Sequence, residues 1–459
     1  MPKKIDRREF LAAAGAAGVA LAATSMATEQ KPQTTRRPAK GAKSAAALVA
    51  PKLDRVRVGF IGVGARGSGH VSHFLNLEGT EIVAIADNYA PNAERSAKSV
   101  QTKTGKAPAI YTNGDRDYKR MLDRNDIDIV IISTPWDWHV PMAVDTMKAG
   151  KHAFTEVPGA TTLDGCWELV DTSEVTQKHC MMMENVNYGR EELMVLNMCR
   201  LGVFGDLLHG EAAYIHDLRG QMQEVEHGTG SWRTLEYAER NGNLYPTHGL
   251  GPVAQYMDIN RGDRLDHLSS VSSPARVREI YAKKNFPPDH KWNKLKFQCG
   301  DINTSIVKTV NGKTLMIQWD EQLPRPYTRH NLIQGTKGIW AGFPDRTVIE
   351  GKTKSTDSWT QAEELASLYQ EFEHPLWKRV GEEAKRMGGH GGMDFIMLWR
   401  IVYCLRNGLP LDQDVYDAAT WSSITPLSEW SVKNRGQSVD VPDFTRGKWK
   451  TMKPLGIVS

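Results

Sequence analysis

The strand–turn–helix segment at residues 55–70 is the feature that most constrains the fold. Its sequence, RVRVGFIGVGARGSGH, begins with a run rich in β-branched residues and continues into glycines with G-x-G-x-x-G spacing: Gly62, Gly64 and Gly67. A second apolar run, EIVAIAD, ends at Asp87, twenty residues after Gly67. Glycines at this spacing permit a tight turn and a close approach of the backbone to a pyrophosphate, and the helix after the turn directs its N–H groups toward it. The segment therefore predicts a dinucleotide-binding unit at the start of a parallel sheet.

Asp87 also favours NAD over NADP. A carboxylate at this place accepts hydrogen bonds from the ribose hydroxyls and repels a 2′-phosphate. The next residues, Asn88 and Tyr89, supply no adjacent arginine. Arg66, inside the glycine loop, has two interpretations, a phosphate contact or a solvated residue at the start of the helix, and the sequence does not separate them.

Alternating strand and helix patterns predict a doubly wound parallel sheet of the Rossmann type over residues 55–188, so the chain is of the α/β class there. From residue 189 the pattern changes to long strand-like runs: 207–220, 267–279, 304–320 and 329–343. The block 228–259 between them is loop-rich and contains a helix from His248 to Ile259. Residues 189–459 are therefore predicted to form a substrate-binding α+β domain with an open, largely antiparallel sheet and C-terminal helices.

The N-terminal 54 residues differ from the rest in composition. Residues 1–27 combine the paired arginines Arg7 and Arg8 with a short Ala-rich apolar stretch and a small-residue pattern that ends at Ala27. This arrangement is typical of a twin-arginine export signal and predicts a periplasmic or secreted protein, with a membrane anchor or a fortuitous Ala-rich helix as the alternatives. Residues 28–54 have the composition of a flexible linker.

The positive charge of the chain belongs to this tail. Residues 1–54 carry ten Lys/Arg and four Asp/Glu, a net charge of +6 against +4 for the whole chain, so residues 55–459 carry −2. Nucleic-acid binding therefore loses its main support. The mature part has no apolar run long enough to span a bilayer. The five cysteines form no C-x-x-C pair and have no histidine partners at zinc-ligand spacing, so we expect no metal site.

Aromatic and polar residues follow the predicted strands at the edge where cofactors bind. The stretch TPWDWH at 134–139 places two tryptophans and a histidine there, although packing beneath a loop would also explain the tryptophans. At the end of the next strand, Glu156 is followed by Val157, whose side chain offers no proton or hydrogen bond. Asn185 ends the strand after that.

The combination of a dinucleotide-binding unit, the stretch AGKH followed by TE-x-P, and a second sheet domain resembles the Gfo/Idh/MocA oxidoreductases. Those enzymes usually carry a lysine between the Glu and the Pro, where this chain has Val157. A finer resemblance is to glycoside hydrolase family 109, the NAD-dependent α-N-acetylgalactosaminidases. The motifs that carry it span nearly the whole mature chain: GVGARG, TPWDWH, TEVPGA, ENVNYGR, AYIHDLRG, SWR, NGNLYPTHGLGP and RPYTR.

The resemblance implies one set of NAD contacts and one set of sugar contacts. The implied NAD contacts are Ala65, Arg66, Asp87, Trp136, Asp137, Trp138, His139, Glu156, Val157 and Asn185. The implied sugar contacts are Tyr214, Arg233, Tyr245, Pro246, Thr247, His248 and Tyr327. On sequence alone, packing competes as an explanation for Tyr245, and a solvated salt bridge competes for Arg233.

An NAD-dependent glycosidase does not need the usual pair of carboxylates. The expected chemistry is oxidation of the sugar at C3 by NAD, removal of the acidified C2 proton, elimination of the aglycone from C1, addition of water and return of the hydride. His248 is the preferred base, because the N-terminus of the helix that it precedes keeps the imidazole neutral. A capping or buried structural role is its alternative. Tyr245 and Tyr214 are the other candidate acid–base residues, and Tyr214 shares one side of a strand with His216.

Two other functions fit the same cleft. An exported NAD-dependent sugar or cyclitol dehydrogenase would release NADH, and Val157 in place of lysine argues against it. A non-catalytic NAD-bound sensor is disfavoured by the density of Tyr, His and Arg side chains. The expected ligand is a small glycoside or a glycan terminus, and the open sheet predicts self-association into a homo-oligomer.

Overall fold

The computed structural model of the chain describes residues 31–454 and 457. It divides into two compact units, Met1–Pro32 and Gln33–Ser459, and every described helix and strand belongs to the second unit. The expected export signal at residues 1–27 lies outside the described residues. In the part of the chain that the structure describes, no helix is long and apolar enough to cross a membrane.

Residues 33–54, where the composition predicts a linker, have no helix or strand and contact the folded body. The backbone N–H of Lys43 donates to the carbonyl oxygen of Glu174. Two residues later, the N–H of Ala45 donates to the Tyr416 hydroxyl at 3.0 Å. This segment therefore lies along the second unit and is held there by hydrogen bonds.

The first half of the unit is a six-stranded parallel sheet in the order β3-β2-β1-β4-β5-β6. Its strands are β1 (Val56–Ile61), β2 (Thr80–Ala86), β3 (Ala109–Tyr111), β4 (Ile129–Ile132), β5 (His152–Thr155) and β6 (Cys180–Met182). Its helices are α2 (Ala65–Phe74), α3 (Ala90–Thr104), α4 (Tyr118–Leu122), α5 (Trp136–Lys148) and α6 (Leu163–Thr176). Strand β4 is buried along its whole length, as expected where helices cover both faces of a parallel sheet. The strand order is that of the Rossmann fold, which confirms the predicted class.

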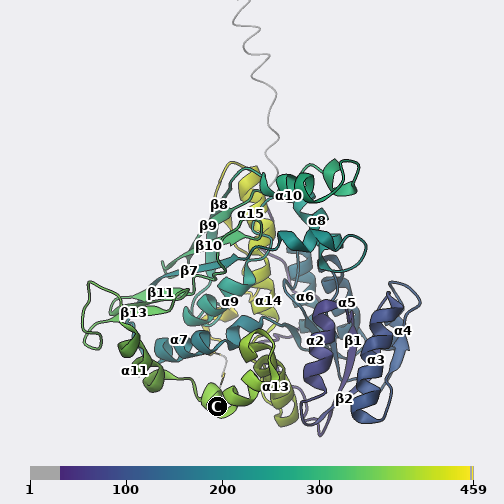
Figure 1. Cartoon of the computed structure of the whole chain (residues 1–459). Coiled ribbons are helices and arrows are strands. Elements are labelled where there is room, and N and C mark those ends of the chain that lie inside the picture. Colours follow the sequence, from purple (N-terminus) through teal and green to yellow (C-terminus); the bar gives the residue numbers. More distant parts are fainter. Residues whose placement is uncertain (1–30, 455–456, 458–459) are drawn as a thin grey trace, which may run out of the picture. The chain divides into compact units, whose positions relative to one another are not determined.

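The second half is built on an eight-stranded sheet in the order β13-β12-β11-β7-β10-β9-β8-β14 (Figure 1, teal and green). Its strands are β7 (Leu207–Ile215), β8 (Leu265–Ser272), β9 (Asn303–Thr309), β10 (Thr314–Asp320), β11 (Leu332–Gly335), β12 (Gly338–Ala341), β13 (Arg346–Ile349) and β14 (Val439–Asp440). Strands β10 and β7 pair in parallel and the other pairs are antiparallel. On β9, Ile306, which is 53 % exposed, and exposed Lys308 alternate with buried residues, so one face of the sheet is open as predicted.

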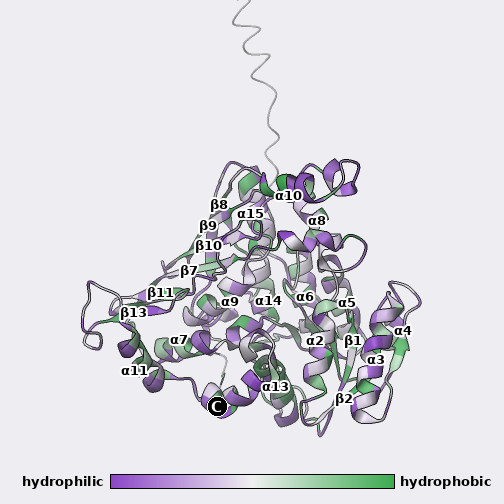
Figure 2. Cartoon of the chain, in the orientation of Figure 1, coloured by the Kyte–Doolittle hydropathy of each residue, from purple (hydrophilic) through white to green (hydrophobic). Residues whose placement is uncertain are grey.

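Helices cover the other face of this sheet and join it to the parallel sheet. They are α7 (Arg190–Arg200), α8 (Thr229–Glu239), α9 (Thr247–Tyr256), α10 (Val277–Asn285), α11 (Ala362–Phe372), α12 (Pro375–Met387), α13 (Met393–Asn407), α14 (Val415–Ser422) and α15 (Ile424–Lys433). Short 3₁₀ segments are η1 (Asn185–Tyr188), η2 (Arg219–Gln223), η3 (Lys291–Lys294), η4 (His390–Gly392) and η5 (Lys448–Lys450). Helix α9 packs on β7, and α14 packs on α6, β6 and α9, so both lie between the sheets. Figure 2 shows apolar residues along the strands of both sheets and hydrophilic residues on the surrounding loops.

Two predicted segments differ from the structure. The block 228–259, predicted to be loop-rich ahead of its helix, contains α8. The buried residues of α8 follow helical spacing but include Arg233 and Thr234, so a search for apolar periodicity misses the helix. Within the predicted strand run 267–279, strand β8 ends at Ser272. The last residues of the run follow Pro274 and belong to α10, which begins at Val277.

Arg66 joins the first helix of the parallel sheet to the C-terminal helix α13. Its Nε donates to Oε1 of Glu156 at 2.7 Å, and its Nη1 and Nη2 donate to the two carboxylate oxygens of Asp394 at 2.7 and 3.0 Å. Arg66 is therefore not a solvated residue at the helix start, because two carboxylates bind its guanidinium. Burial alone would raise the pKa of Glu156, but Arg66 and His70 hold that pKa below its ordinary range. Burial opposes ionisation of Asp394 in the same way, and His390 and Arg66 hold its pKa low.

Arg66→Ala is expected to lower the free energy of unfolding by about 3 kcal/mol at pH 7, because it leaves two buried carboxylates without their cation. Both carboxylates have a folded-state pKa below the ordinary values of 4.5 and 3.8, so the stability they contribute is present above those values and is lost as the pH falls. The deficit of the variant should therefore shrink between pH 5 and pH 3. Urea unfolding at pH 7 and pH 4 measures it.

The control is Arg55→Ala, which removes an exposed ion pair of 3.2 Å with Glu81 on β2. Such a pair contributes below about 0.5 kcal/mol at either pH. A deficit for Arg66→Ala that is as small as this, or that is equal at pH 7 and pH 4, would contradict the role assigned to the bridge.

Candidate functional site

A cavity of about 350 Å³ lies at the carboxyl ends of β1, β2 and β4. Several residues predicted to contact NAD line it: Gly62, Gly64, Ala65, Arg66, Asp87 and Trp138. Asp87 is fixed there by two backbone N–H groups, those of Val63 and Tyr89, each 2.8 Å from one of its carboxylate oxygens. The carboxylate therefore stands ready for the hydroxyls of a ribose.

The glycine loop fits a dinucleotide. Gly62 has φ +79°, which an L side chain rarely adopts, and a Cβ there would lie 2.8 Å from the carbonyl oxygen of Ser133. Gly67 does not line the cavity, and a Cβ on it would overlap the carbonyl oxygen of Gly62. These two glycines fold the turn tightly, and Gly64 presents bare backbone to the cavity at the start of α2. This is the cradle that a pyrophosphate needs.

Within the stretch 134–139, three of the predicted NAD contacts do not line the cavity. Trp136 is buried and packs its ring 5.1 Å from that of Trp232. The two ring nitrogens of His139 lie 2.7 and 2.9 Å from the carbonyl oxygens of Pro158 and Thr134, so the imidazole links the ends of two strands. Asp137 is exposed in the first turn of α5, where a carboxylate favours the helix N-terminus.

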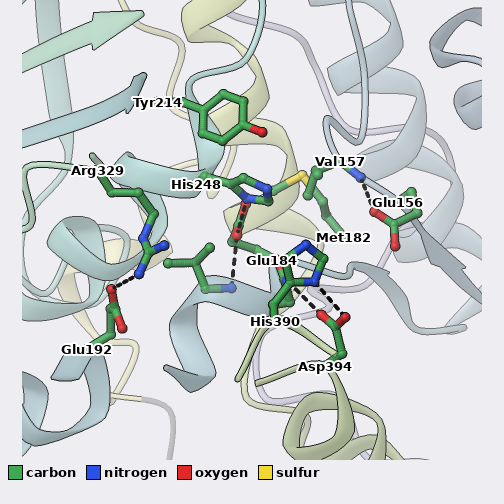
Figure 3. Close-up of polar contacts among 12 residues, drawn as sticks. Glu156, Val157, Met182, Glu184, Glu192, Tyr214, His248, Arg329, His390 and Asp394 are labelled. Atoms are coloured by element: carbon green, nitrogen blue, oxygen red, sulfur yellow. Dashed lines mark hydrogen bonds and ion pairs between the residues drawn. The ribbon is translucent and has the colours of Figure 1, made fainter. Parts of the chain in front are cut away.

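Glu156, Val157 and Asn185 lie together at the ends of β5 and β6, outside the cavity lining. Glu156 accepts hydrogen bonds from Arg66 and from Nε2 of His70, and the N–H of Val157 lies 3.4 Å from its other oxygen (Figure 3). Asn185 donates to Asp394 at 2.6 Å. The network around Arg66 thus reaches from the glycine loop to the ends of these strands.

The three candidate acid–base residues come together from β7 and the start of α9. The ring centroids of Tyr214, Tyr245 and His248 are 4.9 to 5.0 Å apart in each pair. Trp136 lies 5.9 Å from Tyr245, so this cluster adjoins the end of β4. The Tyr214 hydroxyl is 3.0 Å from Nδ1 of His216, so these two neighbours on one side of the strand bind each other. Burial raises the pKa of Tyr214 and of Tyr245 well above 10, so both are neutral phenols.

Glu184 holds His248 and was not found from the sequence. Its Oε1 lies 2.7 Å from Nδ1 of His248 and also accepts from the N–H of Val186 at 3.1 Å (Figure 3). Glu184 is fully buried, whereas the His248 side chain keeps 14 % of its surface exposed. His248 therefore has a carboxylate partner and neither caps its helix nor serves a buried backbone group through Nδ1. The only signal in the sequence was a carboxylate just beyond a parallel strand.

Arg233 lies next to Tyr245 of this cluster and contacts both a carboxylate and aromatic rings. Its guanidinium is 3.5 Å from Oε1 of Glu321 and stacks 4.8 Å from the Trp136 ring and 5.2 Å from the Tyr245 ring. Glu321 also accepts a hydrogen bond from the Tyr237 hydroxyl. Arg233 is thus a buried, oriented cation, which excludes the solvated salt bridge.

The remaining predicted sugar contacts lie around this group. Pro246 and Thr247 are buried at the start of α9, and the Thr247 hydroxyl has no hydrogen-bond partner among the described residues. Tyr327 lies 6.1 Å from Tyr214 and is 38 % exposed. Its hydroxyl accepts from Arg329, which pairs in turn with Glu192. The predicted sugar contacts therefore lie next to one another in the structure, around Tyr214, Tyr245 and His248.

Two family models match the chain. The "Oxidoreductase family, NAD-binding Rossmann fold" model matches residues 56–184, and the "Glycosyl hydrolase 109, C-terminal domain" model matches residues 188–451. A "Glycosyl hydrolase family 109 protein" of Shewanella baltica (strain OS155) is 59 % identical over 99 % of both chains. A "Glycosyl hydrolase family 109 protein 1" of Shewanella sp. (strain MR-4) is 58 % identical over the same share.

Solved structures share the fold at low identity. An NAD binding oxidoreductase from Klebsiella pneumoniae has a TM-score of 0.66 at 16 % identity and covers 85 % of this chain and 99 % of its own. Levoglucosan dehydrogenase in complex with NADH and levoglucosan has a TM-score of 0.64 at 18 % identity and covers 85 % and 100 %. These structures confirm the predicted fold. The match to the NAD-binding Rossmann family confirms NAD as the cofactor, and the cavity fits it. The chain belongs to glycosyl hydrolase family 109 and is an NAD-dependent glycosidase or sugar dehydrogenase built on the Gfo/Idh/MocA oxidoreductase fold.

Proposed function

We propose that this enzyme is a glycosidase that hydrolyses terminal N-acetylgalactosaminides, with the α anomer as its substrate. The observation that carries the proposal is a histidine bound by a buried carboxylate within a wall of neutral aromatic side chains. The neighbouring strand end supports it, because Val157 stands where dehydrogenases of the resembling fold usually have a lysine. Proton handling is therefore assigned to the wall of Tyr214, Tyr245 and His248.

Bound NAD supplies a reversible oxidation at C3 of the sugar, and a C3 ketone makes the C2 hydrogen acidic. His248 then removes that proton. The carboxylate of Glu184 accepts a hydrogen bond from the N–H at Nδ1, so Nε2 is the unprotonated nitrogen that can take the C2 proton. Glu184 also stabilises the imidazolium that forms, since its negative charge is buried beside the ring.

Tyr245 and Tyr214 serve as proton donors in this scheme. Their high pKa keeps both hydroxyls protonated at neutral pH, so either can give its proton to the departing glycosidic oxygen, and the phenolate formed takes a proton back from the water that adds at C1. Protonated His248 returns its proton to C2. Arg233 supplies a fixed positive charge at the back of the wall, suited to hydroxyl or carbonyl oxygens of the sugar. The elimination and the addition of water thus take place between these side chains.

The proposed function is tested by hydrolysis of an aryl α-N-acetylgalactosaminide in deuterated water without added NAD. We expect release of the aryl group and incorporation of deuterium at C2 of the sugar, because C2 is deprotonated and reprotonated in each turnover. Mass spectrometry and proton NMR of the product measure this. Hydrolysis without C2 exchange would exclude the oxidation–elimination scheme, and stoichiometric NADH from a free sugar would assign a dehydrogenase.

Glu184→Gln is expected to lower kcat roughly 100-fold, because the amide no longer fixes the tautomer of His248 or stabilises its protonated form. The acidic limb of the kcat/KM profile should also move to lower pH, since protonated His248 loses a favourable partner. Steady-state rates between pH 4 and pH 9 measure both effects.

The matched control is Glu174→Gln, a buried carboxylate that binds Tyr416 and Arg446 away from the acid–base wall. This substitution is expected to lower stability and to leave the position of the acidic limb unchanged. If Glu184→Gln keeps the wild-type profile, Glu184 has no part in positioning His248.

A further inference from the structure

The cavity for NAD has a second wall that comes from outside the Rossmann half of the chain. The residues that line it come from the loop after η2 and from the first turn of α8: Glu226, His227, Gly228, Thr229, Ser231 and Trp232. They face the loop after β2, where Asp87, Asn88 and Tyr89 line the opposite side. A ligand in this cavity is therefore enclosed between a nucleotide-binding loop and a segment of the sugar-binding half.

A pair of stacked rings closes the gap between the two walls. The ring centroids of Tyr89 and His227 are 4.2 Å apart, with the planes inclined by 26°. The N–H of Tyr89 donates to Asp87, so the stack sits directly beside the carboxylate that is suited to the ribose. Both side chains are exposed, and Tyr89 is 39 % exposed. The stack can therefore open without disturbing the core.

The segment itself has a fixed backbone. The N–H of Gly230 donates to Glu224 at 2.9 Å, and Gly228 has φ +97°. A Cβ on Gly230 would overlap the carbonyl oxygen of Gln221, so the turn folds tightly on η2. Lys291 donates to the carbonyl oxygen of Val225 at 2.9 Å, which ties the segment to the second domain. This segment is thus a preformed arm that meets the Rossmann half through two aromatic contacts, Tyr89–His227 at its tip and Trp136–Trp232 in the first turn of α8.

We propose that residues 226–232 are a cofactor strap, which covers bound NAD and sets the rate at which it leaves. NAD must break the Tyr89–His227 stack to dissociate. This role rests on the proposed function in one respect, because a cofactor that is regenerated in every turnover has no need to exchange. The strap includes the first turn of α8, and Arg233 is the next residue of this helix, so the strap connects the cofactor cavity with Arg233 and the side chains around it.

The test measures the dissociation of NADH from the full-length enzyme. Protein loaded with NADH is mixed with excess NAD in a stopped-flow instrument, and the loss of energy transfer from tryptophan to NADH is followed. Trp138 and Trp232 line the cavity and serve as donors. Tyr89→Ala and His227→Ala should each release NADH about 3- to 10-fold faster, the range expected for loss of one aromatic contact.

Variants that keep the rings separate stacking from other effects. Tyr89→Phe and His227→Phe should retain the wild-type rate, and the double variant Tyr89→Ala/His227→Ala should release NADH no faster than either single variant, because one contact is lost in all three. The control is His267→Ala, which removes a half-buried histidine on β8 outside the cavity lining and should have no effect.

Equal rates of NADH dissociation in wild type and in both alanine variants would overturn the proposal of a strap. Additive effects of the two substitutions on this rate would overturn it as well. The measurement uses no sugar, so its outcome does not depend on glycosidase activity. An enzyme with a strap-dependent NADH rate but no hydrolysis would overturn the proposed function alone. Hydrolysis with C2 exchange in an enzyme whose NADH rate ignores the strap would overturn this inference alone.

Discussion

The bridge from Arg66 to Glu156 and Asp394 is the interaction on which the rest of the site depends. One guanidinium at the start of α2 binds a carboxylate at the end of β5 and another in the first turn of α13. The same Asp394 holds Asn185 at the end of β6. Buried charges of this kind persist only when each has its partner. The bridge therefore fixes the cofactor loop, two strand ends and a C-terminal helix relative to one another.

This saturated network gives a physical reason for Val157. Glu156 already accepts hydrogen bonds from Arg66 and His70, and Val157 is buried beside it. A lysine at this position would bury an ammonium group beside a carboxylate oxygen that already accepts hydrogen bonds from Arg66 and His70, at a high desolvation cost. An apolar residue there is compatible with the network, and the proposed function assigns the basic group to His248.

What the sequence predicts well is local in the chain. The glycine spacing, the strand before it and Asp87 lie within about thirty residues, and the structure brings them together as expected. The partners that orient the site come from far along the chain: Glu184 is 64 residues from His248, and Asp394 is 328 residues from Arg66. No periodicity or motif encodes such pairs, since they arise only when two domains pack. Helix α8 was missed for a related reason, because its buried face carries Arg233, which is satisfied by distant Glu321.

In this arrangement, the glycine loop of the cofactor cavity and the candidate acid–base side chains come from different halves of the chain. In the Rossmann half, the charged groups Asp87 and Arg66 of the cavity are already held by hydrogen bonds. The second half carries the candidate acid–base side chains, with one histidine oriented by a buried carboxylate and two tyrosines kept neutral by burial. A reaction that oxidises and then reduces the same sugar needs this separation, because the proton chemistry at C2 and C1 must proceed while the cofactor stays in place.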